Sequence, residues 1–207
     1  MNILVADDHA IVRKGLIELL REEFPKCEIF EAVNSSEVMQ HMKDRSMDIV
    51  LLDISMPGRN GMETLKQIRA NGMKTPVLML SMHPEDQYAI RALKAGASGF
   101  MNKEAATDQL LTAVNSILKG KKYIPYSVAE KLLESNDRGD KQLHDLLSDR
   151  ELDVLQKIAT GKTVSEIANE LSLSVNTIST YRARLLEKLA LTSNAALARY
   201  AIDHGLV

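Results

Sequence analysis

Three short, continuously apolar segments in the first half of the chain place the strongest constraint on its fold. They are residues 3–6, 49–52 and 77–80, and residues 27–33 and 99–101 are two further strand candidates. Strands that are buried on both faces are apolar throughout, whereas half-exposed strands alternate between apolar and polar residues. Stretches with apolar residues at helical spacing separate the five candidates. The first half therefore predicts a doubly wound α/β domain with a five-stranded parallel sheet.

The second half of the chain predicts helices only. Ser148 with Glu151, and Thr163 with Glu166, match the capping-box pattern that begins helices, and Gly161 can end the helix between them. Residues 135–140 are polar and include a glycine, which is typical of a linker. We expect one domain over residues 1–121, a linker with a short helix over 122–145, and a small all-α domain over 146–207.

Composition narrows the class of protein. Of the 207 residues, 45% are hydrophobic and 26% are charged, a balance typical of globular rather than disordered chains. No apolar run is long enough to cross a membrane, and the single cysteine, Cys27, fits a reducing cytoplasm. The formal net charge is −2, so any binding to DNA must depend on a local basic surface.

Charged and hydroxyl side chains follow four of the predicted strands. The carboxyl ends of parallel strands meet at one edge of a sheet, which is where such folds bind ligands. We expect five side chains to converge there: Asp7, Asp8, Asp53, Ser81 and Lys103.

This combination points to phosphoryl chemistry. Clustered carboxylates repel one another unless a cation neutralises them, and a set of oxygen ligands suits Mg²⁺ better than a softer metal. A carboxylate can form an acyl phosphate, and Asp53, which precedes a turn at Pro57 and Gly58, is the expected nucleophile. No glycine-rich turn follows the first strand, which argues against a dinucleotide-binding enzyme.

Residues 163–189 have the proportions of a helix-turn-helix. Ile167 and Ala168 are expected on the inner face of its first helix, and Val175 and Ile178 on that of its second. No acidic residue occurs between 171 and 186, which suits contact with nucleic-acid phosphates. The outer face of the second helix carries short polar or basic side chains, namely Asn176, Thr177, Ser179, Thr180, Arg182 and Arg184.

The first-half motifs resemble those of a bacterial response-regulator receiver domain, which has the flavodoxin-like strand order 2-1-3-4-5. The motifs are Asp7-Asp8, Asp53 with Met56-Pro57-Gly58, Ser81, 95–99 and Lys103. The resemblance implies that Asp53 accepts the phosphoryl group, that Ser81 and Lys103 contact it, and that Phe100 is an aromatic switch. It also implies Mg²⁺ ligands from Asp8, Asp53 and the backbone carbonyl of Ser55, with Asp7 acting through water.

The second-half motifs resemble the LuxR-type DNA-binding domain. They include residues 147–151, 166–168, Thr177-Ile178 and Lys188-Leu189. A receiver followed by this module is the arrangement of the NarL/FixJ family of transcriptional regulators. The resemblance implies base-facing positions at Ser179, Thr180 and Ala183, and phosphate contacts from Arg182, Arg184 and Lys188.

The expected function is that of a phosphorylation-controlled transcriptional regulator rather than an enzyme. The expected partners are a sensor histidine kinase, double-stranded DNA with inverted half-sites in promoters, RNA polymerase and a second copy of the chain after activation. Two alternatives stay open. One is a regulator that uses the receiver only for protein contacts, and the other is a phosphatase with an aspartate nucleophile. Ser55 argues against the phosphatase, because it occupies the position where related phosphatases carry their general acid.

Overall fold

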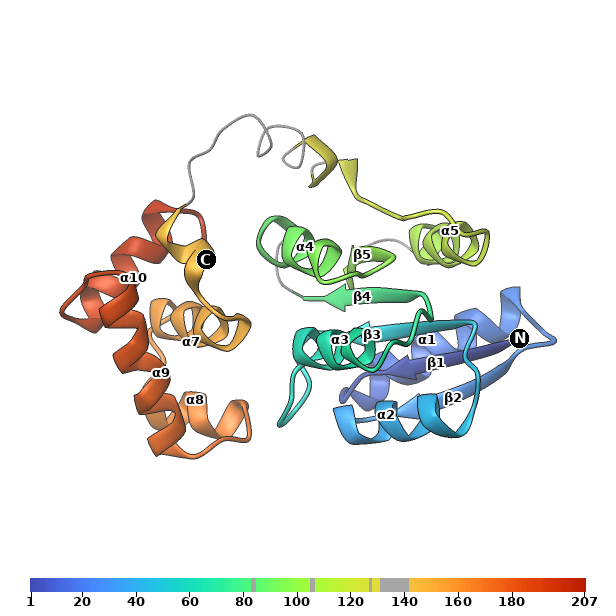
Figure 1. Ribbon diagram of the computed structural model, residues 1–207, viewed down its shortest axis with the longest axis horizontal. Coiled ribbons are helices and arrows are strands. Elements are labelled where there is room, and N and C mark those ends of the chain that lie inside the picture. The colour runs from blue at the N-terminus through green and yellow to red at the C-terminus, as the bar shows by residue number, and fades with distance from the viewer. Residues whose placement is uncertain (83–84, 105–106, 127, 131–141) are drawn as a thin grey trace. The chain divides into compact units, whose positions relative to one another are not determined.

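The computed structural model describes residues 1–82, 85–104, 107–126, 128–130 and 142–207 (Figure 1). The chain divides into two compact units, residues 1–137 and residues 138–207. The polar segment 135–140, interpreted above as a linker, lies outside the described residues, as does the end of the short helix expected before it.

The first unit alternates strands and helices along the whole of its described length. Its strands are all parallel and form one sheet in the order β2-β1-β3-β4-β5, which confirms the predicted fold. The elements in chain order are β1 Asn2–Ala6, α1 Ala10–Glu23, β2 Glu28–Ala32, α2 Ser35–Asp44, β3 Ile49–Asp53, α3 Gly61–Ala70, β4 Val77–Ser81, α4 Glu85–Lys94, β5 Gly99–Asn102 and α5 Thr107–Leu118.

Burial explains why the three central strands are apolar throughout. Every residue of β3 and β4 is buried, and so are four of the five residues of β1. Alternate residues such as Ile3, Leu51 and Leu78 share one core cluster with side chains of α1 and α5. The residues between them, such as Leu4 and Leu52, are fully buried as well, so the other face of the sheet is also covered. Each such side chain stabilises the fold by roughly 1.5–3 kcal/mol relative to an exposed one.

Glycines end three helices of this unit, as the sequence predicts. Gly72, Gly96 and Gly120 follow α3, α4 and α5 with φ angles of +73°, +97° and +77°. A Cβ atom disfavours this left-handed conformation, and glycine therefore allows the chain to turn back toward the next strand.

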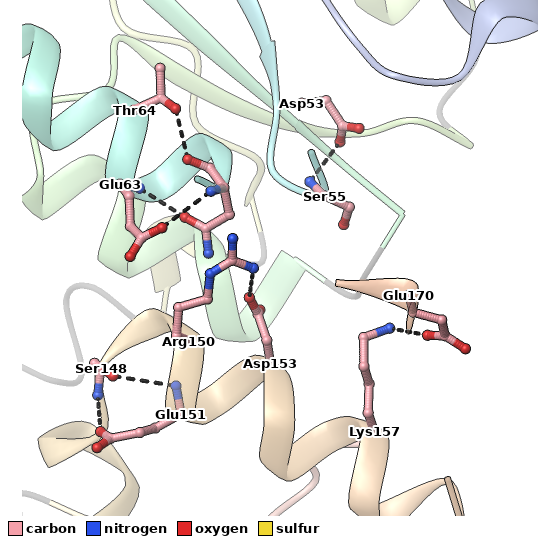
Figure 2. A network of polar contacts seen from close by, with 11 residues as sticks. Asp53, Ser55, Glu63, Thr64, Ser148, Arg150, Glu151, Asp153, Lys157 and Glu170 are labelled. Atoms are coloured by element: carbon pink, nitrogen blue, oxygen red, sulfur yellow. Dashed lines mark hydrogen bonds and ion pairs between the residues drawn. The ribbon is translucent and has the colours of Figure 1, made fainter. Parts of the chain in front are cut away.

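The second unit is helical throughout its described part. It contains the 3₁₀ turn η1 Leu143–Leu146 and the helices α7 Asp149–Ala159, α8 Val164–Glu170, α9 Val175–Lys188 and α10 Asn194–Asp203. The side chains at the four helix starts, Ser148, Thr163, Ser174 and Ser193, each accept a hydrogen bond from a backbone N–H in the first turn. Both predicted capping boxes are confirmed, and Figure 2 shows the one between Ser148 and Glu151.

The helix-turn-helix core confirms most of the predicted inner face. Ile167 and Ala168 of α8 and Ile178 of α9 are buried. The expectation for Val175 was wrong, because its side chain is 48% exposed. Val175 is the first residue of α9, so it lies at the end of the helix, next to the turn and not over the core.

Among the described residues, no helix combines the length and apolar character that a membrane crossing requires.

Candidate functional site

Two buried carboxylates lie at the carboxyl edge of the sheet, on neighbouring strands. Ala6 of β1 pairs with Leu52 of β3, so Asp7 and Asp53 follow directly after paired residues. Both aspartates are fully buried. The backbone N–H of Asp7 donates to the carbonyl of Ala32 at 3.1 Å, which ties this position to the end of β2.

Lys103 joins these two carboxylates. Its Nζ lies 2.7 Å from Oδ2 of Asp7 and 2.8 Å from Oδ2 of Asp53, and its side chain is only 5% exposed. The backbone N–H of Lys103 donates to the carbonyl of Ser81 at 2.8 Å, so the lysine is anchored to the end of β4. Ser81 itself is fully buried. The predicted convergence of strand-end side chains is therefore present in the structure.

Burial dominates the electrostatics of Asp53. Loss of solvation raises the pKa of Asp53 above its usual value, and repulsion from Asp7 adds to this. The ammonium of Lys103 and the backbone N–H of Ser55 lower the pKa, but they do not outweigh burial. The pocket therefore favours added positive charge beside Asp53.

The third carboxylate, Asp8, sits at the more open side of the pocket with His9. Ligand atoms of Asp7, Asp8, His9 and Asp53 all lie within 4.8 Å of one another. Carboxylate oxygens at this spacing fit a divalent cation such as Mg²⁺. His9, which directly follows the acidic pair, was not among the predicted site residues.

The loop after β3 shapes the pocket around Asp53. The backbone N–H of Ser55 donates to Oδ1 of Asp53 at 3.2 Å (Figure 2), and the Ser55 side chain is exposed. Asn60 caps α3 through a capping box with Glu63, and the hydroxyl of Thr64 donates to the carbonyl of Asn60 at 2.8 Å. This cap was not predicted, although asparagine stands three residues before glutamate in the sequence.

Phe100 lies in β5, on the strand that borders β4. Its ring is fully buried, so the structure already holds it in an inward position. The resemblance to receiver domains implies an aromatic switch at this position.

The exposed face of α9 is the second candidate surface. Asn176, Ser179, Thr180, Ala183 and Arg184 are all exposed, as predicted for residues that face a ligand. A shallow hollow on this helix is lined by Asn176, Thr177, Thr180, Tyr181 and Arg184. Short polar side chains beside an arginine suit contact with the edges of bases and with a phosphate backbone.

Four predicted DNA-contacting residues also have partners within the second unit. The hydroxyl of Thr180 donates to the carbonyl of Asn176 at 2.9 Å. Thr177 is half-buried, and its hydroxyl lies 2.8 Å from that of Ser174. Arg182 donates from Nε to Oδ1 of Asn194 at the start of α10. Lys188 Nζ lies 2.7 Å from Oε2 of Glu151 in α7. Arg182 and Lys188 therefore also hold α9 to its neighbouring helices.

Glu151 stabilises the second unit in two ways. Its carboxylate accepts the backbone N–H of Ser148 at 2.7 Å and pairs with Lys188. Burial by itself would raise the pKa of Glu151, but the hydrogen bonds from Lys188 and Ser148 prevail and lower it below its usual value. A lowered pKa in the folded state means that the charged carboxylate stabilises the fold.

Replacing Glu151 with alanine should lower the free energy of unfolding of the second unit by about 1–3 kcal/mol at neutral pH. This stabilisation is fully present above the pKa of the unfolded state and is lost as the pH falls through the lower folded-state pKa, so the difference from the wild type should shrink in acid. Urea unfolding of the full chain at several pH values, with hydrogen exchange to follow α7, measures it. Glu151→Gln keeps the cap but not the charge and should lose less. An equal loss at all pH values would contradict the assignment.

Comparison with known proteins agrees with this geometry. Residues 3–115 match the model of the response regulator receiver domain, and residues 145–201 match that of bacterial regulatory proteins of the luxR family. The response regulator UvrY of Escherichia coli strain K12 is 32% identical, over 100% of this chain and 95% of UvrY. The response regulator GacA of Pseudomonas aeruginosa is 31% identical, over 100% of this chain and 98% of GacA.

A solved structure is similar over nearly the whole chain. RcsB from Salmonella enterica serovar Typhimurium, bound to the promoter P1flhDC in the presence of phosphomimetic BeF₃⁻, has 31% sequence identity and a TM-score of 0.61. The match covers 97% of each chain. A receiver fold with this acidic pocket, followed by a helix-turn-helix unit, defines a response regulator with a DNA-binding output. The chain belongs to the NarL/FixJ family of response regulators, which are transcriptional regulators and not a family of enzymes.

Proposed function

We propose that Asp53 accepts a phosphoryl group from a phosphohistidine of a sensor kinase or from a small acyl phosphate. An oxygen of the Asp53 carboxylate attacks phosphorus, a new O–P bond forms, and the bond to the imidazole or carboxylate leaving group breaks. The observation that carries the proposal is the buried ammonium of Lys103 between Asp7 and Asp53. It supplies fixed positive charge where the phosphoryl oxygens of a modified Asp53 would lie.

Mg²⁺ fits the same pocket. We assign its ligands to Asp8, Asp53 and the backbone carbonyl of Ser55, with Asp7 acting through water. The bound ion would neutralise the carboxylates and the incoming phosphoryl oxygens. The clustering of the carboxylates within 4.8 Å and the burial of Asp7 and Asp53 support this assignment.

The modified Asp53 then acts as a signal within the chain. It carries more negative charge and more acceptor oxygens than the free carboxylate. The Ser81 hydroxyl would hydrogen bond to the phosphoryl group, Lys103 would pair with it, and Phe100 would hold the inward position. Ser55 offers no efficient proton transfer at neutral pH, so the acyl phosphate would persist, as a switch requires and a turnover enzyme does not.

This mechanism requires a phosphoryl-accepting domain, a linker and a DNA-binding domain. We assign residues 1–121 to the receiver, 122–145 to a linker and 146–207 to the DNA-binding domain, and the division of the chain into two compact units supports it. Phosphorylation would bias the second domain toward release or dimerisation, and two copies would bind inverted half-sites roughly 34 Å apart. A kinase, promoter DNA and RNA polymerase are the corresponding partners, all of which meet the protein in the cytoplasm.

For DNA binding by the second unit, we propose that α9 lies in the major groove. Asn176, Ser179, Thr180 and Ala183 would face the bases, with Thr177 beside them. Arg184 would contact a phosphate group. Arg182 and Lys188 would do the same once their contacts with Asn194 and Glu151 break. The exposure of the first group and the shallow hollow beside Arg184 support this placement.

The experiment that tests the function is a selection of DNA fragments by the full-length chain, with and without acetyl phosphate and Mg²⁺. We expect acetyl phosphate to strengthen enrichment of a two-fold symmetric sequence. Asp53→Asn should remove that dependence without changing the preferred sequence. If acetyl phosphate phosphorylates Asp53 but leaves the enrichment unchanged, the result would favour a regulator that does not respond to phosphorylation.

Replacing Arg184 with alanine should weaken binding to most DNA sequences, by about three- to tenfold at moderate salt, and reduce the slope of log affinity against log salt by about 1. Arg184 is preferred to Arg182 for this test, because Arg182 is engaged with Asn194 and its loss would also disturb α10. Fluorescence anisotropy with a labelled duplex over a salt series measures both quantities. Lys43→Ala removes one exposed positive charge from α2 and is the matched control. An unchanged salt slope for Arg184→Ala would remove this residue from the interface.

A further inference from the structure

His9 occupies an unusual place at the start of α1. It is the N-cap residue of this helix, a position where a serine, threonine, aspartate or asparagine side chain normally accepts a backbone N–H. The His9 side chain makes no such bond. Its Nδ1 lies instead 2.9 Å from Oδ1 of Asp8 and 3.3 Å from Oδ1 of Asp7. The backbone N–H of His9 donates to the same Asp7 oxygen at 2.8 Å, which holds the backbone of this residue beside the acidic pocket.

The imidazole thereby adds a nitrogen to a set of oxygen ligands. Among the described residues, Asp7, Asp8, His9 and Asp53 form the one group whose candidate ligand atoms all lie within 4.8 Å of one another. Asp7 and Asp53 are buried at the base of this group, and the His9 side chain, at 59% exposed, stands at its solvent side. The imidazole therefore lies on the solvent-exposed side of this group.

The buried oxygens also point to a cation. Oδ2 of Asp7 and Oδ2 of Asp53 are inaccessible to solvent, and in the described part of the chain no backbone N–H or neutral side-chain donor reaches either of them. Lys103 lies within ion-pair distance of both, but one ammonium faces three carboxylates in this pocket. Buried carboxylate oxygens without full compensation favour the entry of a further positive charge.

We propose that His9 is an additional ligand of the divalent ion in this pocket and that it shifts the metal preference of the site toward first-row transition-metal ions. The proposal rests on the proposed function, since it takes the acidic pocket as the ion site. Mg²⁺ prefers oxygen ligands and gains little from an imidazole. Mn²⁺ and Co²⁺ accept imidazole nitrogen, and the gain rises from Mn²⁺ to Co²⁺ along the usual order of stabilities. With His9 in place, the site binds Mn²⁺ and Co²⁺ more tightly relative to Mg²⁺ than its carboxylates alone would.

A positioning role makes different predictions. If His9 only hydrogen bonds to Asp8, its removal changes the affinity for all three ions by the same factor. Asparagine at position 9 can still donate an N–H to Asp8 but does not replace an imidazole ligand. His9→Asn thus separates the hydrogen bond from the metal–nitrogen bond.

The test measures ion binding by the full-length chain at one neutral pH. Free Mn²⁺ is counted by electron paramagnetic resonance, and Mg²⁺ and Co²⁺ affinities come from competition against Mn²⁺. We expect His9→Ala and His9→Asn to weaken Co²⁺ binding by about tenfold or more, Mn²⁺ binding by about threefold, and Mg²⁺ binding by less than about twofold. Electron spin-echo spectra of bound Mn²⁺ should show coupling to an imidazole ¹⁴N, and both variants should lose it. His204→Ala removes an imidazole from the second unit and should change none of these values.

The outcomes separate this inference from the proposed function. If Mn²⁺ binds to the wild type, Asp53→Ala weakens it, and no ¹⁴N coupling is seen, the pocket is an ion site and His9 is not a ligand. Equal loss of affinity for all three ions in His9→Asn and His9→Ala likewise overturns the inference. If no ion binds to the wild type, or if Asp53→Ala leaves binding unchanged, the ion site in the proposed function fails and the inference fails with it.

Discussion

The Asp53→Asn variant should take up no phosphoryl group from acetyl phosphate in the presence of Mg²⁺. Asparagine has nearly the volume of aspartate, so the pocket keeps its shape, but its neutral amide is not a nucleophile for phosphorus at neutral pH. Lys103 keeps its ion pair with Asp7 in this variant, because that contact does not involve Asp53. Mass spectrometry of the intact chain after incubation with acetyl phosphate measures the uptake directly.

Stability separates loss of chemistry from loss of fold in this variant. Burial and repulsion from Asp7 raise the pKa of Asp53, which means that the charged carboxylate destabilises the folded state. At a pH above that raised pKa, a neutral side chain at position 53 removes this destabilisation. Metal-free Asp53→Asn should therefore unfold at the same temperature as the wild type or at a higher one. Asp108→Asn makes the same change at an exposed site in α5 and should leave labelling intact. A hydroxylamine-sensitive label that persists in Asp53→Asn would place the acceptor elsewhere.

The sheet could be predicted from sequence because its physical cause is local. A strand covered on both faces needs apolar residues throughout, and β3 and β4 show this pattern without interruption. The edge strand β2 is only partly buried, and its predicted range was one residue too long at each end. An edge strand is partly exposed to solvent, and both polar and apolar residues occur in it. The sequence therefore defines the ends of such a strand less sharply.

The acidic pocket could be predicted in part, for the same reason. Asp53 and Ser81 end β3 and β4, and Lys103 directly follows β5. Parallel strands bring their carboxyl ends together whatever the detail of the loops. His9 was missed because its role depends on which way its ring turns at the start of α1. A different rotamer would point the imidazole at solvent, and no spacing in the sequence distinguishes the two.

The face of α9 shows a similar limit. Helical periodicity was sufficient to separate exposed residues such as Ser179 from buried ones such as Ile178. It could not show that Arg182 contacts Asn194, or that Lys188 contacts Glu151, which lies 37 positions earlier in the chain. Long basic side chains reach partners that only the packed helices bring near, so charge alone overstates how many of them are free for a ligand.

The second large effect is expected from Gly61→Ala, which should destabilise the first unit by about 3 kcal/mol or more. A Cβ atom at position 61 would lie 2.0 Å from the backbone oxygen of Asp53, 2.8 Å from its carbonyl carbon and 2.9 Å from Cα of Ile54. These atoms are backbone, so they cannot rotate away as a side chain would. The N–H of Gly61 also donates to the carbonyl of Ile54 at 2.9 Å, which holds the start of α3 against the end of β3.

The same clash should impair phosphorylation in the fraction that stays folded, because relief of the contact must displace the backbone that carries Asp53. Thermal unfolding of the full chain and the initial rate of labelling by acetyl phosphate measure the two effects. Gly15→Ala is the matched control. A Cβ atom at Gly15 meets nothing within 4 Å, and alanine in the middle of α1 should stabilise the helix by roughly 0.5–1 kcal/mol. Equal stability and equal labelling rates for Gly61→Ala and Gly15→Ala would contradict this prediction. They would show that the close packing of α3 against β3 does not hold Asp53 in place.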